Sequence, residues 1–345
     1  MVGQAPAVLA GWRGRVALAL VAIGLLAAYD ATAMRFPDLS DWGDVLWTGI
    51  VLGVPVFGLL WLALPLARRQ RGWLLAATGV LAAVAVAASL LDLETAANLS
   101  KLGAAGAAGF LFVSFFEHAS WLVAVALAIP IADTISVWRG PTRYIVTQKP
   151  SYFEADSVAF PPPGERVVEL SWDAVTGASD YVVVTVRPGH RHRFDLLTQR
   201  SVNLATDAHA RYRIAVKALA GKRQLAESDI ALPPECGCDV TPTRGPGPER
   251  LTLRTTTRPA AERLGLTDVV FFAVFLAGAL RFRLRTGWTW VGLVLGVMLA
   301  GVAGLFDPFG IGGVPALPLI SLGFLVPNAD PLWRSVREAT RPKSP

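Results

Sequence analysis

The chain has 345 residues, of which 53% are hydrophobic and 17% are charged. A soluble globular domain is about 45–50% apolar, glycine included, and about 25% charged. The composition, with a mean hydropathy of +0.47, excludes an ordinary cytosolic enzyme, a disordered chain and a small disulfide-stabilised domain. The apolar residues fall in blocks that reach the roughly 20 residues a helix needs to cross a bilayer. The sequence therefore predicts a polytopic membrane protein.

Charge and cysteine content restrict the partners. The net charge of +6 does not indicate nucleic acid, because basic residues form short clusters beside the hydrophobic runs, where membrane topology explains them. The two cysteines, Cys236 and Cys238, are separated by one residue. A disulfide between them would close a strained ring, and two thiols are too few for a structural zinc site. We therefore expect the lipid bilayer as a partner, and no metal, cofactor or nucleic acid.

Three hydrophobic runs open the chain, and each predicts a span: residues 16–34, 45–66 and 72–91. The first is too long for a secretory signal and is expected to be retained. Acidic residues are expected in the loops after the first and third runs: Asp38, Asp41, Asp44, Asp92 and Glu94. Arginines follow the second run: Arg68, Arg69 and Arg71.

The next hydrophobic run, residues 103–138, is too long for one span. Glu117 and His118 lie in its middle, where ionisable side chains would be costly at bilayer depth. The pattern therefore predicts a hairpin, with helices over residues 103–116 and 121–138 and a turn between them.

Residues 139–263 are polar and are predicted to lie outside the membrane. Alternate positions are apolar in Val168, Leu170 and Trp172, and again from Tyr212 onward, which is typical of half-buried strands. The segments VELSWDAVTGASDYVVVTV and ARYRIAVKALAGKRQLAESDIALPP resemble strands B–C and F–G of a fibronectin type III sandwich. The resemblance implies a β-sandwich at about residues 160–236, with Trp172 and Tyr212 in its core.

Three further runs predict the last spans: residues 266–280, 288–306 and 310–327. Basic residues separate the first two and fill the tail: Arg281, Arg283, Arg285, Arg334, Arg337, Arg341 and Lys343. Eight spans with both termini in the cytoplasm place these clusters inside and the β-domain outside, as the positive-inside rule requires. The chain thus divides into residues 1–138 (N-terminal spans), 139–263 (extramembrane), 264–333 (C-terminal spans) and 334–345 (basic tail). Its use of Ala, Arg and Pro favours a bacterial plasma membrane.

Two aspartates are candidates for chemistry. Asp133 is about five residues inside the outer end of the fifth span, and Asp268 about three residues inside that of the sixth. Two facing carboxylates in a low-dielectric site share a proton, so that one can activate water while the other protonates a carbonyl oxygen. Alternatively, each aspartate only pairs with an arginine or caps a helix.

Pro315 and Pro318 lie near the outer part of the last span, where each removes a backbone donor. Irregular backbone at this depth is tolerated inside protein or along a wet cavity. It could pair with a substrate unwound from its helix. A kinked helix or a re-entrant loop without a catalytic role is the alternative.

These segments together resemble the presenilin and signal peptide peptidase family of intramembrane aspartyl proteases. That family has Tyr-Asp in one catalytic span, Gly-x-Gly-Asp in the next and Pro-Ala-Leu in the last. The matching segments here are AIPIADTISVW, LGLTDVVFF and GVPALPLISLGF. The resemblance implies that Asp133 and Asp268 are the catalytic pair. It also implies residues that shape the active site: Gly265, Thr267, Pro315, Ala316 and Leu317.

The chain departs from the family pattern at two motif positions. Ala132 stands where the family has tyrosine, and Thr267 stands where it has the second glycine. The family also has nine spans, and no β-sandwich as a rule between its catalytic spans. These departures keep a second hypothesis open, in which a presenilin-like protein without activity binds membrane partners through its sandwich.

The sequence therefore predicts an eight-span α-helical membrane protein with an inserted all-β domain. The first functional hypothesis is an intramembrane aspartyl protease that cleaves single transmembrane helices, those with a cytoplasmic N-terminus above all. In it, the sandwich gates access or recruits substrates, and a protein partner of the sandwich is also expected. A third hypothesis, a proton-coupled transporter, is disfavoured because such proteins often show internal repeats and none is visible here.

Overall fold

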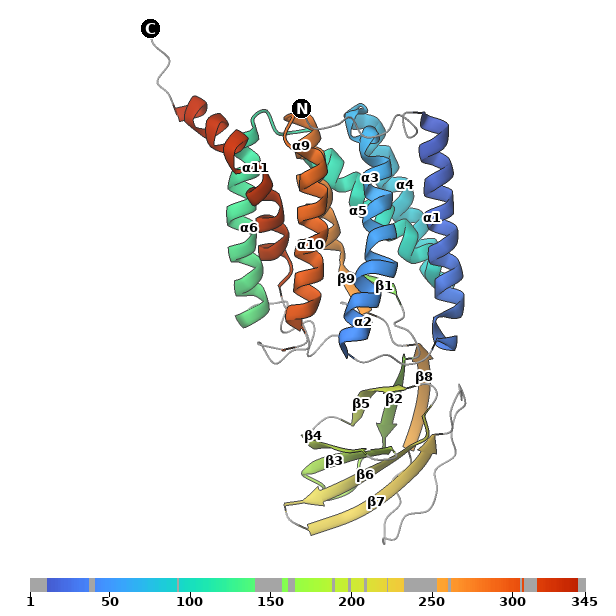
Figure 1. The fold of residues 1–345 in the computed structure, drawn as a ribbon. Helices are drawn as coiled ribbons and strands as arrows, with labels where there is room; N and C mark the ends of the chain where they lie inside the picture. Colours follow the sequence, from blue (N-terminus) through green and yellow to red (C-terminus); the bar gives the residue numbers. More distant parts are fainter. Residues whose placement is uncertain are drawn as a thin grey trace. The chain divides into compact units, whose positions relative to one another are not determined.

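The computed structural model describes residues 11–36, 41–91, 93–139, 157–160, 165–187, 190–197, 200–207, 210–221, 223–232, 253–259, 262–304, 306 and 315–340. Several features of the sequence lie outside these residues, namely Asp38, Asp92, Cys236, Cys238, Asp307 and residues 310–314. The chain divides into two compact units. A helical unit comprises Met1–Asp30, Ser40–Phe160 and Arg263–Pro345, and a β unit comprises Ala31–Leu39 and Pro161–Glu262 (Figure 1).

The helices follow one another in chain order as α1 (Trp12–Thr32), η2 (Ala33–Arg35), α2 (Asp41–Trp47), η3 (Thr48–Gly53), α3 (Val54–Ala63), η4 (Leu64–Arg68), α4 (Arg71–Leu90), α5 (Glu94–Val113), α6 (Ala119–Arg139), α9 (Leu266–Arg281), α10 (Thr286–Gly304) and α11 (Leu317–Thr340). Within the described residues, 6 helices are long and apolar enough to cross a membrane: Trp12–Thr32, Gly49–Arg68, Arg71–Leu90, Glu94–Val113, Ala119–Ser136 and Thr286–Ala303. The helical unit therefore has the build of a membrane protein. The count of eight spans stays a prediction, because α9 and α11 are not among these helices.

The hairpin expected within residues 103–138 is present, since α5 ends at Val113 and α6 begins at Ala119. However, α5 begins at Glu94, in a stretch expected to be a loop. Its polar first turns are helical because they bury one face, through Ala97 and Leu102. The earlier start gives α5 20 residues, enough to cross a bilayer. The loop expected at residues 35–44 is likewise too long, because α2 begins at Asp41.

The last helix differs from the expectation. Pro318 is the second residue of α11, and Pro315 precedes the helix. At a helix start the missing N–H leaves no intrahelical bond unmade, so neither proline interrupts a helix here. The prolines inside α11 are Pro327 and Pro331. They account for the bend of α11 in Figure 1, and the helix continues to Thr340 instead of ending at residue 327.

Helix α9 is the most enclosed element of the helical unit. Every residue from Phe272 to Ala279 is buried. Aromatic rings stack on it from two sides: Phe57 of α3 lies 4.3 Å from Phe272, and Phe324 of α11 lies 4.7 Å from Phe275, between ring centroids. Helices α5, α10 and α11 all contact α9. The helix is therefore surrounded by protein along its middle turns.

Close backbone approaches join the helices at glycines. A Cβ atom added to Gly109 of α5 would lie 2.6 Å from the carbonyl oxygen of Val270 in α9. On α10, Gly292 and Gly296 form a Gly-x-x-x-Gly pair that faces α11. A Cβ at Gly292 would collide with the backbone of Gly323. Inside a membrane, such close contact supplies the dispersion energy that holds helices together.

The Gly292–Gly323 crossing predicts a matched pair of variants. Gly292→Ala should lower the melting temperature of the detergent-solubilised protein, because overpacking costs about 1–3 kcal/mol. Gly287→Ala, on the same helix, should be neutral or slightly stabilising, because nothing lies within 4 Å of the added atom and alanine favours helix. Equal melting temperatures for the two variants would contradict the close approach.

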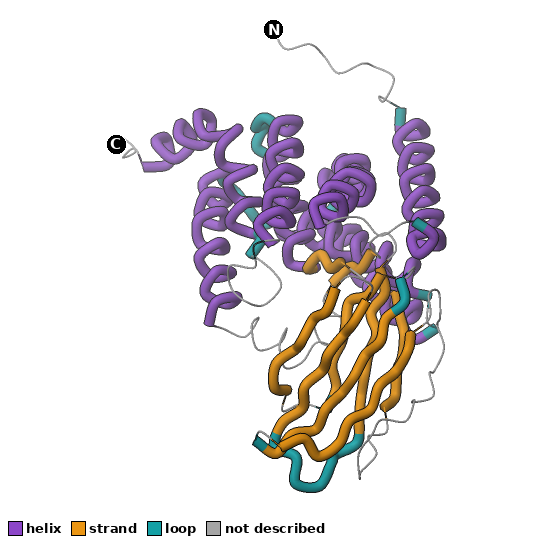
Figure 2. The backbone as a smooth tube through the Cα atoms, turned by 60° about the horizontal axis from the view of Figure 1, so that its bottom comes forward, coloured by secondary structure: helices purple, strands orange, loops and turns teal. Residues whose placement is uncertain are grey.

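The β unit contains most of the strands. In chain order the strands are β1 (Ser157–Phe160), β2 (Glu165–Trp172), β3 (Asp180–Arg187), β4 (His190–Leu197), β5 (Ser201–Asp207), β6 (Tyr212–Ala220), β7 (Arg223–Leu232), β8 (Leu253–Pro259) and β9 (Glu262–Gly265). Two sheets have the orders β5-β2-β8 and β4-β3-β6-β7, and β1 pairs with β9 in a third. Their long strands run side by side in Figure 2.

The two larger sheets share one hydrophobic core. Val168 and Leu170 of β2 contribute from one sheet, and Ile214 and Val216 of β6 from the other. Along β6 buried and less buried positions alternate, as its period of two predicts. Trp172 and Tyr212, the expected core aromatics, are 4% and 8% exposed. The unit is therefore a sandwich of two antiparallel sheets.

Strand β8 was not anticipated from the sequence. It pairs antiparallel with β2 over Arg166↔Pro259 to Trp172↔Leu253. Its sequence, LRTTTRP, reads as polar, but Leu253 and Thr255 are each 3% exposed. Because a polar threonine occupies a buried position, the sequence does not show the alternation of apolar and polar residues that is typical of a strand. The sandwich thus extends beyond the expected residues 160–236. Along the chain β1 precedes β2 and β9 follows β8, and β1 pairs with β9 just as β2 pairs with β8.

The role of β8 can be tested with two soluble fragments. A fragment of residues 160–262 should melt cooperatively with a β-type circular dichroism spectrum. One of residues 160–236 should melt at a lower temperature or stay unfolded, because β2 loses a paired neighbour and the core loses Leu253. Equal stability of the two fragments would show that β8 contributes nothing to the sandwich.

Candidate functional site

Asp133 lies near the C-terminal end of α6, on a helix that contacts α11. Its carboxylate accepts a hydrogen bond from the backbone of Leu317, the first residue of α11. The other carboxylate oxygen, Oδ2, is buried and has no hydrogen-bond partner among the described residues. A buried carboxylate oxygen without a partner is costly. Asp133 is therefore poorly explained as a purely structural residue.

The start of α11 supplies the backbone N–H group that donates a hydrogen bond to Asp133. The first N–H groups of a helix have no partner inside it, and the partial positive charge there favours an anion. Pro315 and Leu317 are buried and Ala316 is half-buried. The structure therefore brings the Pro-Ala-Leu segment against Asp133, from more than 180 residues away in the sequence. As an alternative, Asp133 acts only as a cap supplied from a neighbouring helix.

The helix around Asp133 is locally irregular. Pro130 lies inside α6 and cannot donate a backbone hydrogen bond. One turn later, Thr134 donates from its side chain to the Pro130 carbonyl oxygen at 2.8 Å. Such bonds bend helices slightly. Asp133 thus follows a proline by three residues, at the part of α6 that faces the start of α11.

Asp268 occupies the first turn of α9, where a carboxylate is favoured by the helix dipole. Its side chain folds back toward Gly265, the residue that precedes the helix. A Cβ atom at Gly265 would lie 3.1 Å from Oδ2 of Asp268, so this position leaves little room for a side chain. Thr267 is exposed. A helix turns by about 100° per residue, so the Thr267 side chain projects in a different direction from that of Asp268.

The two aspartates lie at similar distances along their helices from one shared contact. Leu122 of α6 contacts Gly278 of α9, which serves as a common reference point. Asp133 is eleven residues from Leu122 and Asp268 is ten from Gly278, which at 1.5 Å per residue is about 16 Å and 15 Å. Both displacements run toward the same end of the helical unit, because the C-terminal end of α6 lies at the end where β9 leads into the first turn of α9 (Figure 1).

The two carboxylates are not hydrogen-bonded to each other within the part of the chain that the structure describes. Ala132, which stands where the resembled family has tyrosine, is exposed. The described residues contain no group of three or more His, Cys, Asp or Glu side chains that could hold a metal ion. The site therefore consists of Asp133, the start of α11 and, at matched depth on α9, Asp268.

A buried polar cluster near the middle of α11 was missed from the sequence. Asn328 is 0% exposed and accepts a hydrogen bond from the Arg285 backbone N–H at 2.9 Å. It donates to Thr289 Oγ1 at 2.7 Å and to the Phe324 carbonyl oxygen at 2.8 Å. All its polar groups are used, which indicates a structural role. An asparagine directly after a proline in an apolar helix was the available signal.

Comparisons of the chain with protein-family models, with curated proteins and with solved structures give no match. The functional assignment therefore depends on the site itself.

Asp133 and Asn328 should respond oppositely to substitution. Asp133→Asn should leave the melting temperature unchanged or raise it, because the amide oxygen can still accept from Leu317 while the buried charge is removed. Asn328→Leu should cost about 1–3 kcal/mol, because it leaves buried groups without partners. Thermal unfolding in detergent measures both. A large loss in Asp133→Asn would make Asp133 a structural cap.

Proposed function

We propose that the protein is an intramembrane aspartyl protease of the presenilin and signal peptide peptidase type. The observation that carries the proposal is the environment of Asp133. One carboxylate oxygen is held by the backbone at the start of α11, and the other is buried without a partner. Asp268, at similar depth on the adjoining helix α9, supplies the second carboxylate that the chemistry needs.

In the proposed reaction, the ionised aspartate of the pair removes a proton from a water molecule. The water oxygen then attacks the carbonyl carbon of the substrate peptide bond, and the protonated aspartate donates its proton to the carbonyl oxygen. Collapse of the resulting tetrahedral diol expels the amine, which takes a proton from the aspartate that accepted one, while a diol hydroxyl returns a proton to the other aspartate and becomes the carbonyl oxygen of the new carboxyl group. The reaction requires both carboxylates to reach one water molecule, so α6 and α9 must hold Asp133 and Asp268 on either side of it in the substrate complex.

The start of α11 contributes to positioning in this proposal. Pro315 and Pro318 leave two backbone positions without N–H groups, and Leu317 gives its own to Asp133. The Ala316 carbonyl oxygen already accepts hydrogen bonds from Leu319 and Ile320, so an extended substrate would add as a strand to the backbone that precedes this residue. Gly265 contributes to the position of Asp268, because its lack of a side chain leaves room for the carboxylate.

The arginine distribution supports the proposed orientation. The η4–α4 connection, the α9–α10 turn and the C-terminal part of α11 lie at one end of the helical unit (Figure 1). They carry Arg68, Arg69, Arg71, Arg281, Arg283, Arg285, Arg334 and Arg337. By the positive-inside rule this end is cytoplasmic, and the aspartates are nearer the opposite face. The expected substrates are single transmembrane helices with a cytoplasmic N-terminus, cleaved in a bacterial plasma membrane.

For the β unit we propose a fibronectin type III-like sandwich. Its sheets pair β2 with β5 and join β3, β6 and β7. Immunoglobulin-like sandwiches likewise place strands B and E in one sheet and C, F and G in the other. Strand β8 lies at the edge of β2, where that class has strand A. The sandwich would gate access to the site or recruit a protein partner.

A presenilin-like protein without protease activity is the second candidate. Two observations favour it: Ala132 and Thr267 replace residues of the family motifs, and the two carboxylates are not joined by a hydrogen bond within the described residues. In that case the protein would bind membrane partners through its sandwich.

A cleavage assay separates the two candidates. Wild-type protein in liposomes should cut single-span peptides within their apolar segment, as seen by mass spectrometry of the products. Asp133→Asn and Asp268→Asn should each lower the rate at least a hundredfold, because acid–base catalysis alone contributes about 10²–10⁴-fold. Asp330→Asn should keep full activity, because Asp330 is exposed and lies in the C-terminal part of α11.

The opposite result is equally clear. A well-folded wild-type protein that cuts peptides in neither membrane orientation would exclude the protease and favour the binding protein. Cleavage that persists in either aspartate variant would exclude the two-aspartate mechanism.

A further inference from the structure

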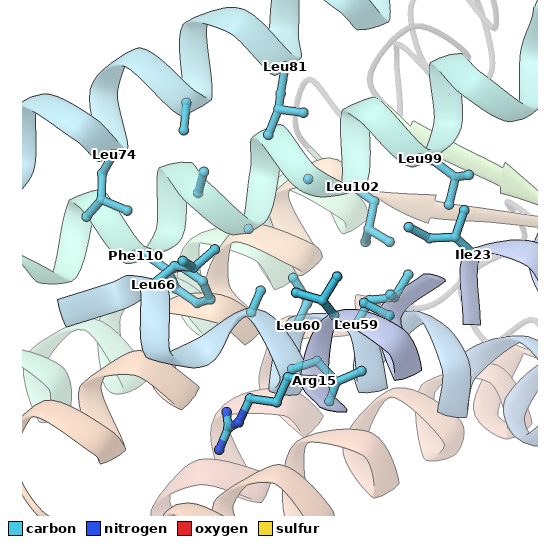
Figure 3. A pocket seen from close by; sticks show the side chains of 18 of the residues that line it. Arg15, Ile23, Leu59, Leu60, Leu66, Leu74, Leu81, Leu99, Leu102 and Phe110 are labelled. Carbon is cyan, nitrogen blue, oxygen red and sulfur yellow. The ribbon is translucent and has the colours of Figure 1, made fainter. Parts of the chain in front are cut away.

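An apolar cavity of about 350 Å³ lies within the helical unit, away from the aspartates (Figure 3). Side chains from α1, α3, α4 and α5 face one another across it, among them Ile23, Leu60, Leu81 and Leu102. Among the described residues that line it, Arg15 contributes the one charged side chain and the others are apolar. An apolar cavity of this kind does not hold water stably.

The cavity exists because α1 is attached at one end only. Its buried residues are Leu26 and Tyr29, both in its C-terminal half. At the same end, Asp30 accepts a hydrogen bond from Thr95 of α5. The first turns of α1 do not close onto the other helices, and Trp12 and Trp73, which line the cavity, are 59% and 47% exposed. The cavity therefore opens to the surroundings beside these two tryptophans.

The opening has the features of a membrane interface. Tryptophan is enriched at the level of the lipid headgroups. Arg15 lies one turn from Trp12 on α1, at the border of the cavity in Figure 3. Arginine binds phosphate oxygens through charge-assisted hydrogen bonds, and this end of the helical unit carries the arginine clusters. An apolar cavity with one arginine at its mouth complements a lipid with an anionic headgroup.

The size of the cavity separates a lipid from a helix as its occupant. An apolar cavity of about 150 Å³ holds one benzene molecule, so the space here suits part of an acyl chain. Two turns of a helix about 10–12 Å wide fill roughly 1,000 Å³, which is too large. We propose that this cavity is a binding site for an anionic phospholipid, with an acyl chain between α1 and α4 and the phosphate on Arg15. The site is independent of the proposed protease activity.

Native mass spectrometry of the full-length protein tests the site. The probes are palmitoyl-oleoyl phosphatidylglycerol and the matching phosphatidylcholine, each added to the delipidated protein in detergent. Wild type should retain phosphatidylglycerol in preference to phosphatidylcholine. Arg15→Gln should reduce that preference about fivefold, the effect expected of one arginine near an anionic headgroup. Arg13→Gln, an exposed arginine on the same helix that does not line the cavity, should leave it unchanged.

A second pair of variants tests the acyl-chain site. Ala77→Phe should fill the cavity and abolish retention of both lipids, whereas Ala76→Phe, its exposed neighbour on α4, should not. A phosphatidylglycerol with a diazirine on its acyl chain should label α1, α4 or α5 in wild type and lose that labelling in Ala77→Phe.

Three results would overturn the proposal. They are equal retention of the two lipids by wild type, retention and labelling unaffected by both Arg15→Gln and Ala77→Phe, and displacement of the lipid label by a single-span peptide that itself cross-links to the cavity. The last result would make the cavity a peptide-docking groove.

Discussion

Close contact between helix backbones is the interaction on which the helical unit depends. In a bilayer, lipid tails are as apolar as leucine side chains, so burial alone does not hold helices together. The glycines at Gly109, Gly292 and Gly323 let helices approach until backbone meets backbone. This encloses α9 between α5, α10 and α11, and α9 carries Asp268 in its first turn. The position of one candidate catalytic residue therefore follows from glycines on other helices.

The start of α11 links this architecture to the second aspartate. Helix α11 contacts both α6 and α10, so its first N–H group is held at a set place beside α6. Asp133 uses that donor with one oxygen and leaves the other without a partner among the described residues. In contrast, Asn328 near the middle of the same helix satisfies all of its hydrogen-bonding groups. Asn328 therefore stabilises the fold, whereas Asp133 has a cost in stability. Such a cost is typical of residues in functional sites.

The β unit is inserted in a way that leaves the helical unit intact. The strands β1 and β9 that flank the insertion pair with each other, and so do β2 and β8 inside the sandwich. The insertion between α6 and α9 separates Asp133 from Asp268 in sequence, while β1 and β9 pair with each other on its two sides.

Hydropathy and period alone determined much of this protein. They predicted long apolar helices, the turn between α5 and α6, and the strands around Trp172 and Tyr212, because each depends on the local pattern of apolar residues. Only the tertiary structure decided the start of α5 at Glu94, the continuation of α11 past Pro327 and the strand β8, because each is stabilised by neighbours distant in sequence. The sequence nominated Asp133, Asp268 and the Pro-Ala-Leu segment. The hydrogen bond from Leu317, the unpartnered oxygen and the lipid-sized cavity beside α1 depend on how whole helices meet, which no local pattern encodes.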